Sequence, residues 1–442
     1  MQEPAIMPTK PGTMDSALIW GPRKRLAFRF CFLYFGLYVL VTQMLSSLFL
    51  APSIDVPEIG TLRPLRAIIS WAAAHIFHHQ AALVVTGSGS GDKTFDWVES
   101  FCLLLMALGV TAIWSLADRK RLNYSAVFKW FHLFLRFAVG STMFAYGFDK
   151  AIPLQMSFPS LTRLIEPFGD FSPMGVLWAS IGASTGYEIF AGCAEILGGV
   201  LILIPRTATL GALVCVADMT QVFLLNMTYD VPVKLFSFHL ILMCLFLLGP
   251  EAARLFDFFF RNQPVSSPKP LALFQTVRAN RFAFFAQIGI LFYLVSMNIY
   301  GGLKAWKEYG GGAPKSELYG IWNVDEFIMD GQLHPPLLTD TPRWRRIVFQ
   351  SPTSATFQKM DDTFVRYASA VQLSDKSLIL RDTNEKEPKA KLSFQRNAPG
   401  QLLLDGVMDG HAIRLRLQLV EREKYLLVNR SFHWIQEYPF NR

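Results

Sequence analysis

Long apolar stretches alternate with short polar ones over the first two thirds of the chain. A transmembrane helix needs about 20 predominantly apolar residues. Seven stretches reach or approach this length: 26–50, 98–116, 130–148, 176–204, 207–226, 233–250 and 282–301, all approximate. The third is marginal, because Lys129, His132 and Arg136 lie in its first turns. The pattern predicts a polytopic α-helical membrane protein of about seven spans.

A shorter apolar stretch over 62–83 carries Arg63, Arg66 and three histidines. These polar residues favour a helix that lies on the membrane surface over one that crosses the bilayer. The alternative, a further span, would move every later loop to the opposite side of the membrane.

Basic clusters beside the spans predict the orientation, because cytoplasmic loops are enriched in Lys and Arg. The clusters are Arg23–Arg25, Arg119–Arg121, Arg206, and the group Arg254, Arg261, Lys269, Arg278 and Arg281. Seven spans place all of them, with the N-terminus, in the cytoplasm. Loops 51–97 and 149–175 and the C-terminal portion then lie outside. The first stretch is too long for a secretory signal and predicts an uncleaved span.

Beyond Lys315 the pattern changes to short alternating runs that are typical of antiparallel strands. The runs are Arg343–Phe349, Thr353–Met360, Ser377–Arg381, Gln401–Gly406, Ala412–Val420 and Lys424–Asn429. Turns every 8–12 residues or so favour a barrel or a sandwich. We therefore expect a C-terminal all-β, barrel-like domain outside the cytoplasm.

These patterns divide the chain into seven parts. They are an N-terminal cytoplasmic tail (1–25), two leading spans with an outer loop and interfacial helix (26–129), a four-helix membrane bundle (130–250), a cytoplasmic linker (251–281), a last span (282–301), a glycine-rich flexible linker (302–316) and the β-rich domain (317–442).

Composition agrees with a membrane protein. The chain is 52% hydrophobic and 17% charged, whereas soluble domains have about 25% charged residues. The net charge of +8 lies largely beside apolar spans, so orientation and lipid head groups explain it better than nucleic acid does. The five cysteines all lie in apolar stretches without a CxxC pair. They are typical of small buried hydrophobes rather than of disulfides or a zinc site.

Four ionisable residues lie inside the apolar stretches between 174 and 249, where they are costly and are functional candidates. They are Glu188, Glu195, Asp218 and His239. Glu195, Asp218 and His239 each lie about 15–16 Å from the cytoplasmic end of their helices, at 1.5 Å per residue. We expect these three to meet near the middle of the membrane, with Gln221 on the face of Asp218.

A second polar layer is predicted nearer the outside. Its members are Tyr146, Asp149, Lys150, Tyr187, Glu188, Asn226, Asp230 and Lys234. Arg136, about 9 Å deep in the third span, is expected to neutralise one of the carboxylates. Two explanations stay open: the polar groups bind a ligand, a proton or a quinone, or they hold the helices together through hydrogen bonds and ion pairs.

The stretch from about Trp130 to Gly249 resembles the DoxX family of small four-helix membrane proteins. The resemblance rests on LRFAVGSTMFAYGFDKAI (Leu135–Ile152) and on YEIFAGCAEILGGVLILIPRTATLGAL (Tyr187–Leu213). In the second segment a Gly–Ala–Glu helix meets a short Arg–Thr turn. Glu195 and Arg136 match recurring polar positions of the family.

Some members of that family are subunits of thiosulfate:quinone oxidoreductase, and some are linked to protection from oxidative stress. The resemblance implies a bacterial inner-membrane protein with quinone as its cofactor or ligand. This chain departs from the family pattern by adding two leading spans, a trailing span and a β domain. Any electron donor must then be a partner or a soluble substrate, because the sequence carries no haem, flavin or iron–sulfur motif.

Two further motifs lie in the region 62–97. His75, His78 and His79 share one helix face, which makes them weak metal-binding candidates or water-facing residues of a surface helix. The glycine–serine loop 86–97 predicts a flexible segment in which Asp92 or Thr94 caps the next helix. The alternative is a functional lid over the outer polar layer.

Gly320-Ile-Trp322 opens the β domain, and its closing segment Arg430–Arg442 contains a late arginine. This combination resembles a lipocalin-like barrel, in which such an arginine stacks over the tryptophan. A different sandwich or open barrel is the alternative. Scattered histidines and turn acids favour a binding or docking module over a catalytic one.

Three functional hypotheses follow. The leading one is a DoxX-like protein of quinone-linked redox chemistry, in which Glu195 and Asp218 exchange protons and Glu188, Gln221, His239, Arg136, Tyr146 and Lys150 contact or support the ligand. The second is a transporter or lipid-handling protein without redox turnover. The third is a structural or assembly factor. In each case membrane lipids are partners, and the outer β domain is expected to dock a protein or a lipophilic ligand.

Overall fold

The computed structural model describes residues 19–50, 56–265, 272–382, 387–430 and 432–441. Most of the predicted tail 1–25 and part of the linker 251–281 lie outside these ranges. The chain divides into two compact units. The helical unit comprises Met1–Ala151 and Ala191–Gly301, and the β unit comprises Ile152–Phe190 and Gly302–Arg442.

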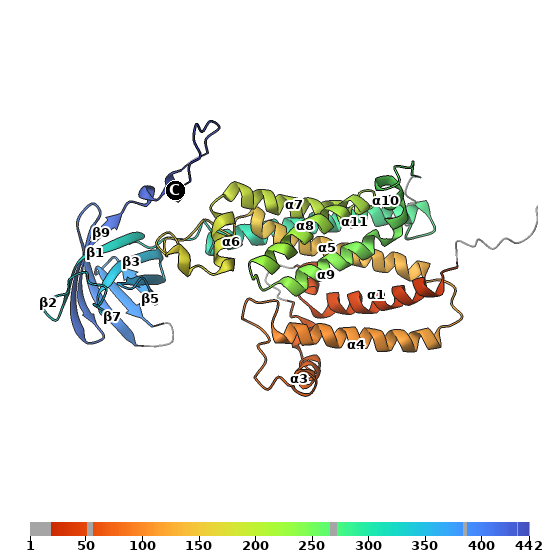
Figure 1. Ribbon diagram of the computed structural model, residues 1–442, viewed down its shortest axis with the longest axis horizontal. Coiled ribbons are helices and arrows are strands. Elements are labelled where there is room, and N and C mark those ends of the chain that lie inside the picture. Colours follow the sequence, from red (N-terminus) through yellow and green to blue (C-terminus); the bar gives the residue numbers. More distant parts are fainter. Residues whose placement is uncertain (1–18, 51–55, 266–271, 383–386, 431, 442) are drawn as a thin grey trace, which may run out of the picture. The chain divides into compact units, whose positions relative to one another are not determined.

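Eleven helices precede the strands within the described ranges (Figure 1). They are α1 (Pro22–Val41), α2 (Met44–Leu48), α3 (Leu65–His75), α4 (Thr94–Ala117), α5 (Ser125–Ala151), α6 (Pro173–Gly182), α7 (Thr185–Leu203), α8 (Ala208–Thr228), α9 (Lys234–Leu248), α10 (Ala252–Phe259) and α11 (Val277–Glu308).

Of the helices in the described ranges, five are long and apolar enough to cross a membrane. They are α4, α7, α8, α9 continued by α10, and α11. The predicted first and third spans form α1 and α5, whose several charged and polar side chains leave them outside this group. With 11 residues, α3 is about 16 Å long and too short to span.

The predicted span 176–204 is not one continuous helix. The chain breaks after Gly182, so that α6 and α7 are separate. A Cβ at Gly182 would lie 2.3 Å from the carbonyl oxygen of Met156, so backbone from the preceding loop packs directly against this position.

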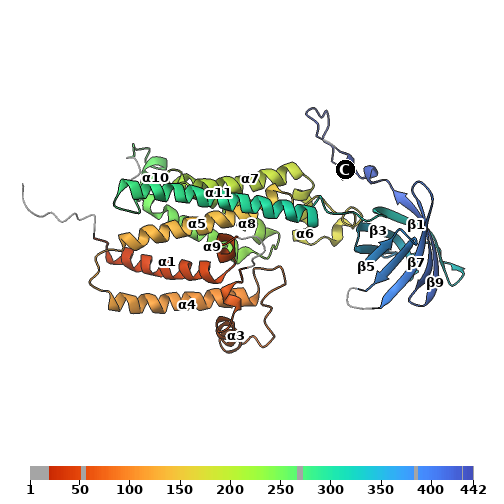
Figure 2. The same ribbon diagram turned by 180° about the vertical axis from the view of Figure 1, so that it is seen from behind.

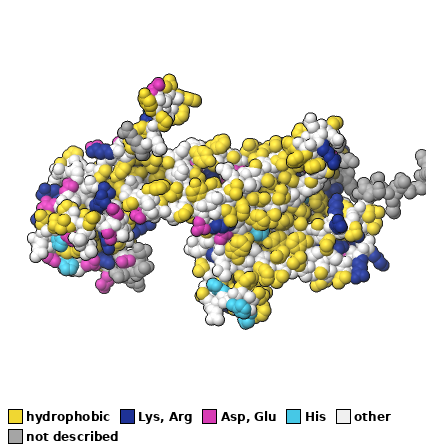
Figure 3. All heavy atoms as spheres, viewed as in Figure 1, with side chains coloured by type: hydrophobic (Ala, Val, Ile, Leu, Met, Phe, Trp, Pro, Cys, Tyr) yellow, Lys and Arg dark blue, Asp and Glu magenta, His cyan; other side chains and the backbone are white. Residues whose placement is uncertain are grey.

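Basic residues meet at one end of the helical unit. Arg25, at the start of α1, donates to the carbonyl of Arg121, just beyond α4 (2.7 Å). In Figure 3, dark blue side chains gather at this end, while hydrophobic side chains cover much of the helical surface between the ends. The helices therefore expose apolar flanks and collect positive charge where α1 begins and α4 ends.

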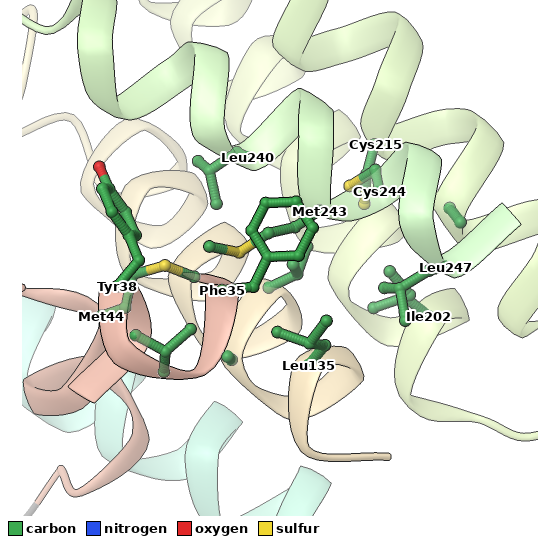
Figure 4. Packing of buried hydrophobic residues seen from close by; sticks show 14 of the residues in the cluster. Phe35, Tyr38, Met44, Leu135, Ile202, Cys215, Leu240, Met243, Cys244 and Leu247 are labelled. Carbon is green, nitrogen blue, oxygen red and sulfur yellow. The ribbon is translucent and has the colours of Figure 1, made fainter. Parts of the chain in front are cut away.

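Large side chains fill the interior where α1, α5, α8 and α9 meet. In both ribbon views α1 lies beside α4 (Figures 1 and 2), and its other face packs on α5. Phe35, Leu135 and Met243 come from three different helices and lie together in this core (Figure 4). Of the five cysteines predicted to be buried hydrophobes, Cys215 and Cys244 are fully buried free thiols in the same cluster, whereas Cys193 is exposed.

Helices α5 and α7 approach each other through glycines. A Cβ at Gly192 would lie 2.5 Å from Gly147 O, and one at Gly199 would lie 3.1 Å from Gly140 O. The pairing of 147 with 192 and of 140 with 199 makes the helices antiparallel. Small residues permit such contact between helix backbones in membrane bundles.

The predicted β domain is confirmed as a closed antiparallel barrel. Its strands are β1 (Gly320–Met329), β2 (Gln332–Leu333), β3 (Trp344–Ser351), β4 (Ser354–Lys359), β5 (Phe364–Gln372), β6 (Ser377–Arg381), β7 (Pro388–Ala398), β8 (Gln401–Met408) and β9 (His411–Val420). Each long strand pairs with the next, and β9 pairs back with β1, so β1 and β3 to β9 close the ring.

The barrel interior is packed with side chains. On β9, Ile413, Leu415 and Leu417 are buried while the intervening residues are exposed, as the two-residue period of a strand requires. Phe327 and Phe357 belong to the same core. The predicted strand Lys424–Asn429 is wrong, because this segment forms a turn and the short helix α12 (Leu426–Asn429).

The ends of the barrel differ in part from the lipocalin-like expectation. The indole of Trp322 donates to the carbonyl of Leu318 (2.9 Å), whereas the guanidinium of Arg430 lies 4.3 Å from the ring centre of Phe440. Arg442 lies outside the described residues. The segment between α5 and α6 packs on the barrel, where Leu161 joins a small core with Val348.

The glycine contact between α5 and α7 yields a stability prediction. Gly192→Ala places a Cβ 2.4 Å from Ala151 N, and such overpacking costs about 1–3 kcal/mol. We expect a lower unfolding temperature in detergent, measured by intrinsic fluorescence. The matched control is Gly186→Ala on the same helix, where the Cβ meets nothing within 4 Å. Equal unfolding temperatures for the two variants would contradict the contact.

Candidate functional site

A buried ion pair joins α5 to α7. Lys150 Nζ donates to Glu195 Oε1 at 2.6 Å. The exposed fractions are 7% for Lys150 and 1% for Glu195. Two charges removed from water require close pairing and further hydrogen bonds to offset their desolvation. This pair is therefore a close ionic contact between the two helices.

Helix geometry explains how the pair forms. Lys150 lies three residues after Gly147, and Glu195 lies three residues after Gly192. Because α5 and α7 are antiparallel, Lys150 and Glu195 lie on opposite sides of the glycine contact along the helix axes. Side chains of a helix lean toward its N-terminus, so the two side chains lean toward each other and meet. The sequence analysis placed Lys150 in the outer layer and missed this partnership.

Asp218 on α8 extends the charged site. It is half-buried, and the charges of both Glu195 and Lys150 act on it. Neither Glu195 Oε2 nor Asp218 Oδ2 has a hydrogen-bond partner among the described residues. The joint role of Glu195 and Asp218 in proton exchange stays a prediction. Gln221, predicted to share the face of Asp218, is exposed and does not line the site.

Arg136 does not neutralise a carboxylate, contrary to the expectation. Its Nε donates to Ile202 O at 2.7 Å, and its Nη2 donates to Leu203 O at 2.6 Å. The last carbonyls of a helix lack partners within the helix, and a cation there interacts favourably with the helix dipole. Arg136 therefore caps the C-terminus of α7, and the cation that pairs with Glu195 is Lys150.

His239 is buried but bonds to α1 rather than to the acids. Its Nδ1 lies 2.7 Å from Leu235 O, so Nδ1 carries the hydrogen. The other nitrogen lies 2.8 Å from the Tyr34 hydroxyl, within hydrogen-bond distance. The ring of Tyr38 stacks on the imidazole at 4.0 Å. The depth of His239 along its helix gave no indication that Tyr34 and Tyr38 contact it.

The predicted outer layer is divided in the structure. Lys150 Nζ lies 5.8 Å from the ring centre of Tyr146. Asn226 donates to Ser237 at 3.1 Å, which ties α8 to α9. Glu188 lies in the β unit, where its Oε1 accepts the amide of Met156 at 2.8 Å. Of the other four predicted members, Asp149, Tyr187 and Asp230 are exposed, and the half-buried Lys234 pairs with Asp230 at 3.0 Å.

The loop 86–97 is held more firmly than expected, and Asp92 caps a distant helix. Its two oxygens accept the amides of Lys234 and Leu235 at 2.8 and 2.9 Å, at the N-terminus of α9. The predicted cap of α4 by Asp92 or Thr94 is wrong. There the backbone amide of Lys93 donates to Asp96 at 2.9 Å instead.

The histidine candidates for a metal site do not converge. His75 stacks on Trp71 at 4.9 Å, and His78 has a positive φ of 54°. In the part of the chain that the structure describes, no group of three or more His, Cys, Asp or Glu side chains is placed to hold a metal ion.

Charged contacts in the β unit support turns. His411 Nδ1 lies 2.6 Å from Asp330 Oδ2, and the amide of Ala412 donates to Asp330 Oδ1 at 2.9 Å. These bonds hold the pKa of Asp330 below its ordinary value, because they stabilise the carboxylate. The pair joins the two-residue turn after β1 to the start of β9.

Fold and site together define a class: a multi-helix protein whose apolar helices are long enough to cross a membrane, with a buried Lys–Glu pair and a C-terminal β-barrel. The chain is 38% identical over 137 residues to "Uncharacterized protein YwoB" of Bacillus subtilis (strain 168). The match covers 31% of this chain and 84% of that protein, and the chain belongs to its family. No family model matches the sequence, and no solved structure matches significantly.

The ion pair predicts a strong effect of removing one partner. Lys150→Met leaves the buried Glu195 carboxylate uncompensated, which costs about 3–5 kcal/mol. Unfolding in mixed detergent micelles measures this loss. Adding Glu195→Leu to the same variant is expected to restore most of the stability, because an apolar pair avoids the desolvation of charge.

The matched control is Lys304→Met. Lys304 pairs with Glu308 at 3.8 Å, and both side chains are about 60% exposed. Such surface pairs contribute about 0–1 kcal/mol. If Lys150→Met were no more harmful than Lys304→Met, the pair would not stabilise the bundle.

Proposed function

We propose that this chain is an integral membrane protein that binds a quinone beside Lys150, Glu195 and Asp218 and takes part in quinone-linked redox chemistry. The observation that carries the proposal is the pair of buried carboxylate oxygens, Glu195 Oε2 and Asp218 Oδ2, without partners among the described residues. A buried polar group without a hydrogen bond costs about 1–3 kcal/mol, so a polar ligand group or a proton at this site is favoured.

The chemistry of the site suits such a ligand. The Lys150 ammonium donates hydrogen bonds and stabilises negative charge on a carbonyl oxygen. Glu195 and Asp218 are able to give or accept protons when the ligand changes its protonation. Lys150 thus takes the supporting role that the sequence analysis assigned to Arg136. The resemblance of 130–250 to the DoxX family supports quinone as the ligand.

The proposed arrangement in the membrane has seven spans. It adds α1 and α5 to the five apolar helices and counts α6 with α7. The contact of Arg25 with Arg121 supports a shared basic end, which the positive-inside rule assigns to the cytoplasm. In this arrangement the protein lies in a bacterial inner membrane, with the β-barrel outside. The filled interior of the lipocalin-like barrel favours docking of a partner over binding of a lipophile.

A structural role is the second candidate, and one specific observation favours it. Lys150 and Glu195 already satisfy each other at 2.6 Å, so the pair is able to hold α5 on α7 without any ligand. In that case Glu195→Gln and Asp218→Asn variants would keep near-normal function, since neutral side chains of the same shape still pack.

Quinone content tests the leading proposal. The protein is purified in mild detergent and extracted with organic solvent, and the extract is analysed by mass spectrometry. We expect stoichiometric quinone in the unchanged chain and a loss of about tenfold or more in Glu195→Gln, because one charged hydrogen bond is removed. Quinone-dependent activity is expected to disappear in the same variant.

The control is Glu423→Gln, an exposed position in the β unit, which should leave the quinone content unchanged. Absence of quinone from the unchanged chain, or equal retention in Glu195→Gln, would refute the redox role. A single enriched lipid in place of quinone would favour the lipid-handling alternative.

A further inference from the structure

A polar cavity of about 310 Å³ lies in the helical unit, and neither Lys150 nor Glu195 is among its described lining residues. Its walls come from the C-terminal end of α1, the N-terminal ends of α4 and α9, and the loop 85–91. Small-molecule sites begin at about 300 Å³, so the volume suits a small ligand.

The charges around this cavity do not balance. Among the described residues, four charged side chains line it: Glu58, Lys93, Asp96 and Glu99. The Lys93 ammonium lies 2.9 Å from Asp96 Oδ2 and donates to Ser90 O at 2.7 Å. Lys93 and Asp96 therefore compensate each other, and among the described residues the other two carboxyl groups have no paired cation.

Glu99 is the deeper of these two groups. Its exposed fraction is 7%, and its Oε1 has no hydrogen-bond partner among the described residues. It reaches the site because Gly60 leaves room, since a Cβ at Gly60 would lie 1.6 Å from Glu99 Oε1. Glu58 is exposed and lies at the rim.

Aromatic rings form the opposite wall. Tyr38, Tyr146 and Phe236 line the cavity. Tyr38 is held by its stacking on His239, and the ring centre of Tyr146 lies 5.9 Å from that of Phe236. Faces of aromatic rings attract cations, so both the rings and the acids favour positive charge.

The loop that closes the cavity is fixed at one end. The amide of Gly91 donates to Pro232 O at 2.8 Å, next to the Asp92 cap of α9. Gly87 and Gly89 have φ values of +80° and +71°, which let the loop turn over the site. The cavity wall is therefore part of the fold of this unit.

We propose that this cavity binds a small organic cation, an ammonium group held between Glu99 and Glu58 and against the rings of Tyr38 and Tyr146. Two sources share this chemistry: the amine head group of a zwitterionic lipid and a free amine from solution. Glu99 is five residues into α4, or about 8 Å from its start. This depth is close to the head-group region of a bilayer, and the site is reached from one end of the helices.

The experiment measures the unfolding temperature of the full chain. Free ethanolamine and choline are titrated into protein in detergent. In parallel, the protein is placed in nanodiscs of phosphatidylethanolamine with phosphatidylglycerol, and in nanodiscs of phosphatidylglycerol alone. The test variants are Glu99→Gln and Gly60→Ala, whose new Cβ displaces the Glu99 carboxylate. The controls are Glu423→Gln and Gly109→Ala, where a Cβ on α4 meets nothing within 4 Å.

We expect an amine to raise the unfolding temperature of the unchanged chain. The apparent affinity for the amine, taken from this rise, should fall about tenfold or more in both test variants and stay unchanged in both controls. Stabilisation by free amines identifies a soluble ligand, whereas stabilisation only by phosphatidylethanolamine identifies the lipid head group. If Glu99→Gln fails to fold, Glu58→Gln at the exposed rim replaces it, and the same loss is expected.

Two results would overturn the proposal. One is no stabilisation by either amine source, or equal stabilisation of the test and control variants. The other is preferential stabilisation by phosphatidylglycerol alone that depends on Lys93, which would define an anion site. Neither result depends on quinone, so the outcome is independent of the redox proposal.

Discussion

Two charges buried between touching helices are the constraint on which the membrane site depends. Lys150 and Glu195 are nearly inaccessible to solvent, and their charges are tolerable only when their side chains meet. They meet because Gly147 and Gly192 let the backbones of α5 and α7 approach closely. Arg136 holds the far end of α7 through its last carbonyls. Packing, capping and ion pairing therefore fix one helix pair, and Glu195 Oε2 and Asp218 Oδ2 have no hydrogen-bond partner among the described residues.

Much of the helical unit could be predicted from the sequence because apolar runs set helix length. The helix expected over 207–226 is α8, Ala208–Thr228. The acids and His239 were correctly expected to be buried or half-buried. Their partners could not be predicted from depth, since depth says nothing about which helix faces which. The repeated three-residue step from glycine to charge, Gly147 to Lys150 and Gly192 to Glu195, was the available signal. It becomes informative only once the two helices are known to be antiparallel neighbours.

The same distinction between local and long-range information applies elsewhere. Strand β6 was predicted at its observed bounds, Ser377–Arg381, because alternation is local. The segment Lys424–Asn429 also alternates, but it follows the last barrel strand and has no edge left to pair with, since β9 pairs with β1. Asp92 precedes α4 and has the right side chain for its cap, yet it caps α9, which begins 142 residues later. Each failure comes from a contact that the closed fold supplies and that no window of sequence contains.

The central claim is that the glycine contact positions the ion pair, and its most direct test is the coupling between Gly192→Ala and Lys150→Met. The free energy of unfolding is measured in mixed micelles for the unchanged chain, the two single variants and the double variant. If the contact positions the pair, Gly192→Ala already weakens the pair. The loss of unfolding free energy in the double variant is then smaller than the sum of the two single losses by about 1 kcal/mol or more. Losses that add within about 0.5 kcal/mol would show that the pair forms independently of the contact and would contradict this account.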